Sequence, residues 1–339
     1  DFANTKTGFN QMVKWSRKEA VKGQPLTYLM EPTGSYYEKL AYHLNKIGLT
    51  VYVVLPNKAR QWCEAEGVKT KTDAMDARCL ALMGCASRKL SPWSPPAAIY
   101  RELRQITRFH ADLCKVRTSV ANRMEALDNM YGPDKSVRKH CEKLLEEIDN
   151  LMEKNDEALL CKLAEDKDLK SKVERIAGAK GVSIQTVACV IAETDGFHLI
   201  RNRKQLTSYT GFDVVAKQSG GQDPKHKISK KGNANISAAL YMPALVATRY
   251  NKQMKAAYDR ICQKHPNEKK IGVTAVMRRI LLLIYTLWKN GEEYDENKDK
   301  ANAKGKKKQA QEHGPEDCLA VNEEHVEGVA EDENGQPSS

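Results

Sequence analysis

The chain has 339 residues, enough for two domains with cores of their own. It carries 55 Lys and Arg against 44 Asp and Glu, and residues 312–339 hold nine of those acids and no Lys or Arg, which leaves the rest with a net charge of +20. This balance predicts a polyanionic partner such as nucleic acid. The nine scattered cysteines, with no zinc-type spacing, argue against a metal-stapled or disulfide-stapled class. We expect a cytoplasmic protein, because no signal peptide is visible and the longest apolar run, 280–288, is too short to span a bilayer.

Residues 1–95 alternate between strand and helix patterns. The predicted strands and helices cover residues 9–15 (helix), 26–30 (strand), 36–47 (helix) and 51–55 (strand), with two more helices starting at Pro56 and Thr72. Such alternation predicts an α/β domain with parallel strands covered by helices.

Three carboxylates stand out in this first domain. Glu31 ends the strand-like run YLME, and Asp73 and Asp76 are three residues apart in KTDAMDAR, so they share one helix face. Carboxylates on a strand end and a helix face are typical of a Mg²⁺ site. The alternative is structural, because Thr72 or Asp73 would cap a helix at this point. Spacing alone favours the cap.

From residue 97 the apolar residues recur at intervals of three and four. The pattern predicts one long amphipathic helix over residues 99–131, a turn at 132–134 and a second helix over 137–152. We assign residues 96–170 to a coiled-coil arm that joins copies of the chain. The alternative is a helical hairpin that folds onto its own domain.

Residues 171–290 predict a second, mostly helical domain, and residues 291–339 a disordered tail. The glycine-containing turn at 176–182, ahead of a helix at 184–194, is a weak signal for backbone amides that face phosphate. A long apolar-periodic helix is predicted over 236–250.

A polar, glycine-rich segment, KQSGG at 217–221, precedes a run of cations in the second domain. Ser219 lies in this segment, and the cations that follow it are Lys225, Lys227, Lys230 and Lys231. A serine beside several cations suits attack on a phosphodiester. A lone serine in a solvated basic turn is the simpler interpretation from the residues alone. Ser229 and Ser237 are weaker nucleophile candidates, and Arg201 and Arg203, with Lys204, form a second basic cluster for nucleic acid.

Two separate blocks of the sequence resemble one family in the same order and spacing. The first is MEPTGSYYEKLAYHLNKIGLTVYVVLPNKARQW followed by KTKTDAMDARCLA, and the second is SYTGFDVVAKQSGG followed by KISKKGNANISAALYMPALVATRYN. Both are similar to the IS-one-ten group of insertion-sequence transposases, also called DEDD transposases, over residues 1–290.

The resemblance implies a RuvC-like, ribonuclease-H-type first domain that holds Mg²⁺ with Glu31, Asp73 and Asp76. It implies that Ser219 is the nucleophile for DNA strand cleavage and exchange. It also implies three partners, namely the DNA of element ends and target, a structured guide RNA and further copies of the chain, in a bacterial, nucleoid-associated setting.

The resemblance also implies a first acid on a strand that precedes the start of this sequence. Asp1 is not a convincing substitute, because no strand precedes it. We therefore expect these 339 residues to lack one ligand of the acid set. This motivates one alternative function, a catalytically defective remnant that still binds nucleic acid. A structure-selective nuclease is a third hypothesis, since it would share the metal acids and need no serine.

Overall fold

The computed structural model describes residues 1–32, 34–68, 72–87, 90–198, 200–217 and 225–295. The chain divides into two compact units, Asp1–Ala97 and Ala98–Ser339. Ser219 and nearly all of the predicted tail, residues 291–339, lie outside the described residues.

The first unit is built on two short parallel strands. Its elements are α1 (Lys6–Glu19), β1 (Thr27–Met30), α2 (Tyr36–Lys46), β2 (Thr50–Val53), α3 (Pro56–Ala65) and α4 (Asp73–Ala86). The register pairs Tyr28 with Val51, and α2 makes the crossover that parallel strands require. Ala41, Leu44 and Val51 are buried in its small core. The predicted order of strands and helices is confirmed, and the strands are only four residues long.

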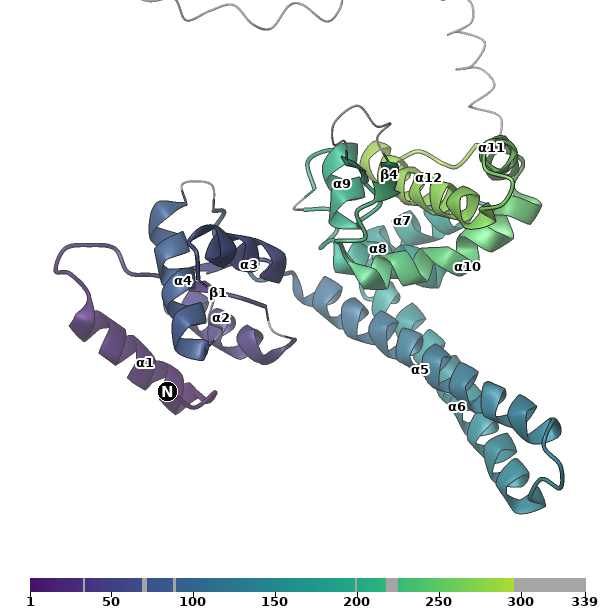
Figure 1. Ribbon diagram of the computed structural model, residues 1–339, viewed down its shortest axis with the longest axis horizontal. Helices are drawn as coiled ribbons and strands as arrows, with labels where there is room; N and C mark the ends of the chain where they lie inside the picture. Colours follow the sequence, from purple (N-terminus) through teal and green to yellow (C-terminus); the bar gives the residue numbers. More distant parts are fainter. Residues whose placement is uncertain (33, 69–71, 88–89, 199, 218–224, 296–339) are drawn as a thin grey trace, which may run out of the picture. The chain divides into compact units, whose positions relative to one another are not determined.

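The second unit begins with a long helical hairpin. α5 (Ala98–Asp128) and α6 (Lys135–Ala164) lie side by side along their length (Figure 1). Asp134 caps α6 by accepting hydrogen bonds from the amides of Ser136 and Val137. α6 continues to Ala164, beyond the predicted end of the second helix at residue 152.

The rest of the second unit is a helical domain with one β-hairpin. Its elements are α7 (Lys167–Ala177), α8 (Ile184–Glu193), α9 (Arg203–Tyr209), β3 (Val214–Lys217), β4 (Lys225–Ile228), α10 (Ala234–Tyr250), α11 (Lys252–Lys264) and α12 (Lys269–Asn290). β3 and β4 pair antiparallel. These strands were not predicted, because each is only four residues long and β4 contains a single apolar residue.

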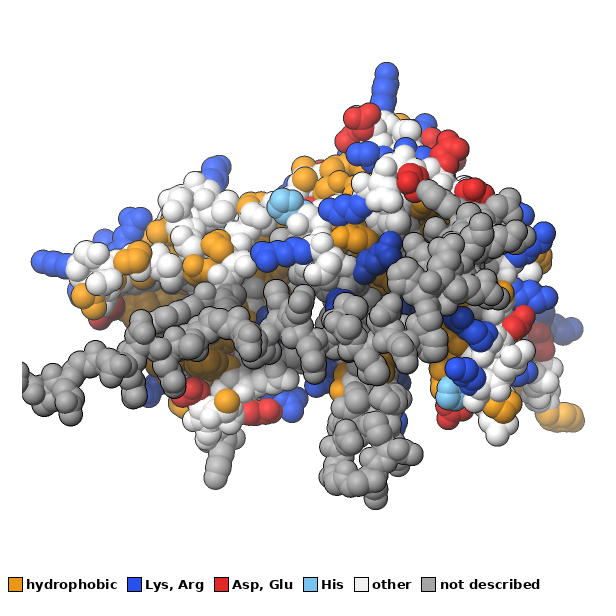
Figure 2. Space-filling model, turned by 90° about the horizontal axis from the view of Figure 1, so that it is seen from above, with side chains coloured by type: hydrophobic (Ala, Val, Ile, Leu, Met, Phe, Trp, Pro, Cys, Tyr) orange, Lys and Arg blue, Asp and Glu red, His pale blue; other side chains and the backbone are white. Residues whose placement is uncertain are grey.

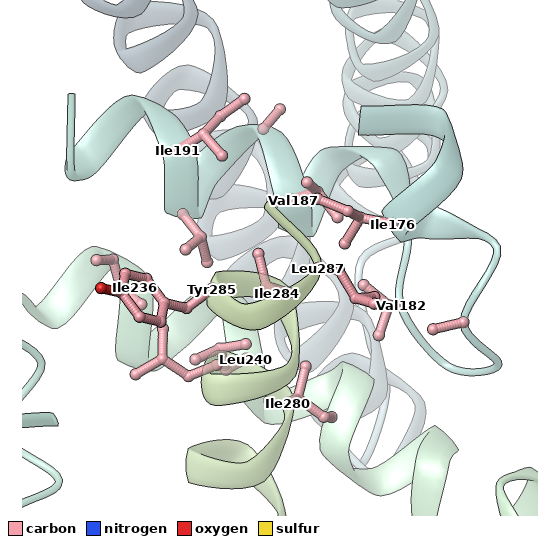
Figure 3. Packing of buried hydrophobic residues seen from close by; sticks show 14 of the residues in the cluster. Ile176, Val182, Val187, Ile191, Ile236, Leu240, Ile280, Ile284, Tyr285 and Leu287 are labelled. Atoms are coloured by element: carbon pink, nitrogen blue, oxygen red, sulfur yellow. The ribbon is translucent and has the colours of Figure 1, made fainter. Parts of the chain in front are cut away.

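The core of this domain forms around α12. Side chains of α12, among them Ile280 and Ile284, meet Val187 of α8 and Leu240 of α10 (Figure 3). Among the described helices α12 is long and apolar enough to be a membrane-span candidate, but half of that stretch is buried. Its contacts make it the buried helix that the sequence predicts.

The glycine turn before α8 has a packing role. Gly181 has a φ of 91°, and a Cβ there would lie 2.9 Å from the Cβ of Ala247 on α10. The absent side chain is what lets the turn approach α10 so closely. This turn was only a weak signal for amides that face phosphate, and Gly181 faces a helix of its own domain.

Candidate functional site

The three acidic residues lie on two neighbouring elements of the first unit. Glu31 directly follows β1, and Asp73 and Asp76 lie in the first turn of α4. α4 packs beside β1, since a Cβ built on Gly84 would lie 3.6 Å from Leu29 Cδ1. Thr72 is the N-cap of α4 and its hydroxyl accepts from the Met75 amide at 3.3 Å. Asp73 and Asp76 are therefore not needed as caps.

Within the described residues, no three acidic, His or Cys side chains lie close enough together to hold a metal ion. Glu31 is thus not gathered with the two aspartates into a closed site. Asp76 lies near α3 instead, where its charge acts on Cys63. Partial burial, the neighbouring Cys79 and then Asp76 raise the pKa of Cys63 to about 11.

The donor chemistry of the aspartates nevertheless suits Mg²⁺. This ion commonly takes only one or two protein carboxylates and completes its shell with water and substrate phosphate. Asp73 is exposed and Asp76 is half-buried, and they lie one helical turn apart in the first turn of α4. The pair fits a magnesium site that is completed by substrate.

Ser219 comes between β3 and β4 in the sequence and lies outside the described residues. The base of the hairpin is fixed by backbone and side-chain bonds. The Ser229 hydroxyl donates to a carboxylate oxygen of Asp213, and the Ser229 amide donates to the Asp213 carbonyl at 2.8 Å. The Ser237 hydroxyl donates to the Thr210 carbonyl at 3.0 Å. The two weaker nucleophile candidates therefore both have structural hydrogen bonds.

Gly211 and Gly232 allow two turns to cross at this base. A Cβ on Gly232 would lie 2.2 Å from the Gly211 amide nitrogen, which no side chain could tolerate. The Lys230 amide donates to the Gly211 carbonyl at 3.1 Å, and Lys230 itself has a φ of 54°. The cations after β4 thus start from a rigid backbone.

A buried carboxylate ties the start of α10 to the arm. Glu193 ends the apolar helix α8, and its side chain is 2% exposed. Arg108 of α5 donates to both of its oxygens, at 2.7 and 3.0 Å. The amides of Asn233 and Asn235 donate to the same carboxylate at 2.7 and 3.2 Å. The charge is therefore fully hydrogen-bonded, as a buried charge must be.

Other groups reinforce the same junction. Tyr209 donates to the Glu193 carbonyl at 2.8 Å, and Arg104 of α5 donates to the Ala192 carbonyl at 2.8 and 3.1 Å. Both arginines thus lie at the C-terminus of α8, where a cation is favoured. Burial, together with the charge of Glu193, raises the pKa of Cys189 to about 12.

The predicted phosphate-binding cations have different surroundings. Lys227, Lys230 and Lys231 are exposed at the end of the hairpin, whereas the Arg203 guanidinium donates to the Thr286 hydroxyl of α12 at 3.1 Å. Figure 2 shows Lys and Arg side chains recurring over the visible face, among exposed hydrophobic ones. The exposed lysines can meet phosphate without rearrangement.

Comparison with known proteins identifies the family. Residues 1–133 match the DEDD-type IS110 transposases, and residues 173–259 match the transposase family described as IS116/IS110/IS902. The chain belongs to the IS110 family of transposases. It is also similar to the pilin gene-inverting proteins of Moraxella bovis and Moraxella lacunata, each 26% identical over 301 residues, which cover 87% of this chain and 89% of the relative. An IS110-family transposase is a DNA recombinase, and DEDD transposases typically use a divalent metal.

Sequence reasoning missed the Glu193 junction of this IS110-family chain. One signal was available, since Glu193 is the only charged residue of the otherwise apolar and polar helix IQTVACVIAE. Its partners could not be found by spacing, because Arg108 precedes it by 85 residues and Asn233 follows by 40. Arg108 falls within the first matched segment, Glu193 and Asn233 fall within the second, and the structure joins them.

Proposed function

We propose that this protein is the DNA transposase of an insertion sequence, and that it cuts and exchanges strands with Ser219 as nucleophile. The observation that carries the proposal is that Ser219 falls within the second matched segment, between the paired strands β3 and β4 in the sequence and ahead of exposed lysines. We assign residues 1–95 to a RuvC-like domain, 96–170 to a coiled-coil arm and 171–290 to the serine domain. The division into units at Ala97 supports the first boundary.

The cleavage step needs one bond made and one broken. The Ser219 oxygen attacks the scissile phosphorus, a phosphoserine ester forms, and the bond to a deoxyribose oxygen breaks. The serine proton passes to solvent and the leaving oxygen takes a proton. A hydroxyl from another strand then attacks the ester, which restores the serine and joins the exchanged strands.

The cations of the hairpin stabilise this step. Lys227, Lys230 and Lys231 donate to phosphate oxygens, where negative charge develops as the phosphorus becomes five-coordinate. Because Lys230 and Lys231 lie in the turn that crosses Gly211 just before Gly232, little reorganisation of their backbone is needed when DNA binds. Further phosphate contacts along the bound strand would come from Lys225, Arg201 and Arg203.

Glu31, Asp73 and Asp76 would serve as Mg²⁺ ligands, with Asp73 and Asp76 as the pair that fits this ion best. When bound, the metal would withdraw charge from the phosphate and assist deprotonation of the serine. The acids and the serine belong to different units, so we propose a composite site that forms when DNA brings the two together.

We further propose that the arm joins copies of the chain. Of its predicted apolar seam, Leu103 and Leu113 are buried, whereas Phe109 and Val116 are 49% and 48% exposed. Leu144 on α6 is also 48% exposed. These apolar side chains could pack against the α5–α6 hairpin of a second copy of the chain. Such packing would allow the composite site to form across subunits. A structured guide RNA would pair with the DNA, since aromatic residues are only 6% of the chain and stacking platforms are few.

The names of the Moraxella relatives describe inversion of a gene, which requires strand exchange as well as cutting. This supports a recombinase over a nuclease that only resolves junctions. One observation favours the binding-remnant alternative, namely that the described residues gather no three-ligand metal site.

A recombination assay separates these functions. The protein expressed from its complete reading frame is supplied with a plasmid that carries its genomic element, and excised or inverted junctions are amplified and sequenced. New junctions that depend on Ser219 support the transposase. Binding without junctions indicates the remnant, and cleavage that survives Ser219→Ala indicates a nuclease.

A further inference from the structure

A pocket of about 310 Å³ opens beside the hairpin of β3 and β4, here called the serine hairpin. It lies between α10, α12 and the crossing turns that follow α9 and β4, and its lining includes Ile228, Lys230, Tyr241 and Met277. Its size is at the lower end of the range for small-ligand sites in proteins. The glycine crossing at Gly211 and Gly232 forms part of its wall, so its shape is fixed by backbone.

The lining combines an aromatic ring with apolar walls. Tyr241 is 45% exposed, whereas Phe212 and Met277 are 4% and 7% exposed. A partly exposed tyrosine over a buried apolar wall can stack against a flat ring that enters the pocket. A purely aliphatic ligand would not need the aromatic face.

Two hydroxyl groups of the lining, those of Ser237 and Thr274, offer hydrogen-bond acceptors to the pocket. The hydroxyl of Ser237 donates to Thr210, and that of Thr274 donates to the Lys270 carbonyl at 2.9 Å. Because both hydroxyl protons are donated to backbone carbonyls, the two hydroxyl oxygens can act only as hydrogen-bond acceptors toward a ligand in the pocket. They can accept from a ring N–H or an exocyclic amino group, which are the donors on nucleobase edges.

The charge around the pocket selects an anionic ligand. Lys230 lines it, and Lys227 and Lys231 are exposed beside it on the same segment. A ligand with a flat, hydrogen-bond-donating ring and a phosphate on each side matches all of these groups. A nucleotide within a strand is such a ligand.

We infer that this pocket takes one unstacked base of the DNA strand whose phosphate is presented to the serine hairpin. The inference rests on the proposed function and adds a base-binding subsite to it. Extruding one base beside a scissile phosphate would hold the strand in register during exchange, and the stacking energy on Tyr241 offsets the cost of unstacking.

Photo-crosslinking tests the subsite directly. Short mixed-sequence DNA strands that carry 5-iododeoxyuridine at one position each are bound to the intact chain, irradiated and mapped by mass spectrometry. We expect an adduct on Tyr241. Tyr241→Ala should weaken binding of the same strands roughly 5- to 150-fold, the loss of one stacked base, and Tyr241→Phe should restore it.

Two further variants control the test. Tyr250→Ala removes a 67% exposed tyrosine from the same helix outside the pocket lining and should bind DNA like the parent chain. Thr274→Leu fills the pocket, keeps the helix and should suppress the Tyr241 adduct. The subsite is overturned if Tyr241→Ala binds DNA as tightly as the parent, or if only RNA of the same sequence with 5-iodouridine labels Tyr241. Absence of any DNA binding by the parent chain would overturn the proposed function as well.

Discussion

Arg108 of α5 and Glu193 of α8 form a two-pronged ion pair, with N–O distances of 2.7 and 3.0 Å. The carboxylate is buried and the guanidinium is half exposed. Because the same carboxylate accepts from Asn233, the N-cap of α10, the pair connects the arm to the turn that leads from β4 into α10. The position of the arm is thereby coupled to the base of the hairpin.

Removal of the guanidinium should loosen this junction. Arg108→Ala leaves Glu193 with only the two asparagine amides, and we expect a loss of roughly 2 kcal/mol in local stability. Hydrogen exchange should rise in α8 and at the start of α10. Arg117→Ala breaks an ion pair on the same helix in which both partners are 47% exposed, and it should leave these amides unchanged. Equal protection in both variants would contradict the coupling.

Asp76→Asn should weaken Mg²⁺ binding and abolish cleavage by the protein expressed from its complete reading frame. It should also raise the melting temperature of the metal-free protein slightly, because it removes a like charge one turn from Asp73. Isothermal titration with MgCl₂ measures the first effect. Thr72→Ala is the matched control, since it removes the cap of α4 at a cost of about 1 kcal/mol and should leave the titration unchanged. If Asp76→Asn unfolds the unit with an unchanged titration, Asp76 is a structural residue.

Val116→Glu should dissociate the oligomer without melting either unit. Val116 is 48% exposed on the hairpin, so a carboxylate there disturbs only a surface that a second copy would cover. Analytical ultracentrifugation at micromolar concentration gives the oligomeric state. Thr118→Glu places the same charge on an exposed position two residues away and should leave the state unchanged. A monomeric parent chain would end the arm hypothesis.

The helical hairpin of α5 and α6 should resist mild acid and lose stability in strong acid. The hydrogen bond from Arg117 lowers the pKa of Asp149, and bonds from Ser136 and Val137 lower the pKa of Asp134. A lowered folded-state pKa adds stability that is complete above the unfolded value near 4 and is lost as pH falls through the lowered value. Helix content by circular dichroism should hold from pH 7 to about 5 and fall below about 4. Asp134→Asn keeps the cap without the charge, and should show a smaller acid loss.

The sequence predicted what local patterns encode. Thr72 marks the start of α4 because N-caps act on their own helix, and the apolar period predicted a helix over 99–131 where α5 covers Ala98–Asp128. Local patterns also account for the parallel pairing, since a helix separates the two strands.

The rest depends on contacts between distant segments. β3 and β4 are only four residues long, and only their pairing makes them strands. The role of Gly181 depends on Ala247, which lies on another helix. The seam of α5 divides into buried and exposed members only once α6 packs against one side of it. A single sequence contains none of these long-range pairings in readable form.

The most direct test of the central claim is the covalent link to Ser219. The protein expressed from its complete reading frame is incubated with labelled DNA of its element end, its RNA and Mg²⁺, and then separated on a denaturing gel. We predict a slow protein–DNA band from the parent protein, whose crosslinked peptide contains Ser219. Ser219→Ala should fold and bind DNA but give no band, and Ser219→Cys should give a weak one. A band from Ser219→Ala equal to that of the parent would place the nucleophile elsewhere.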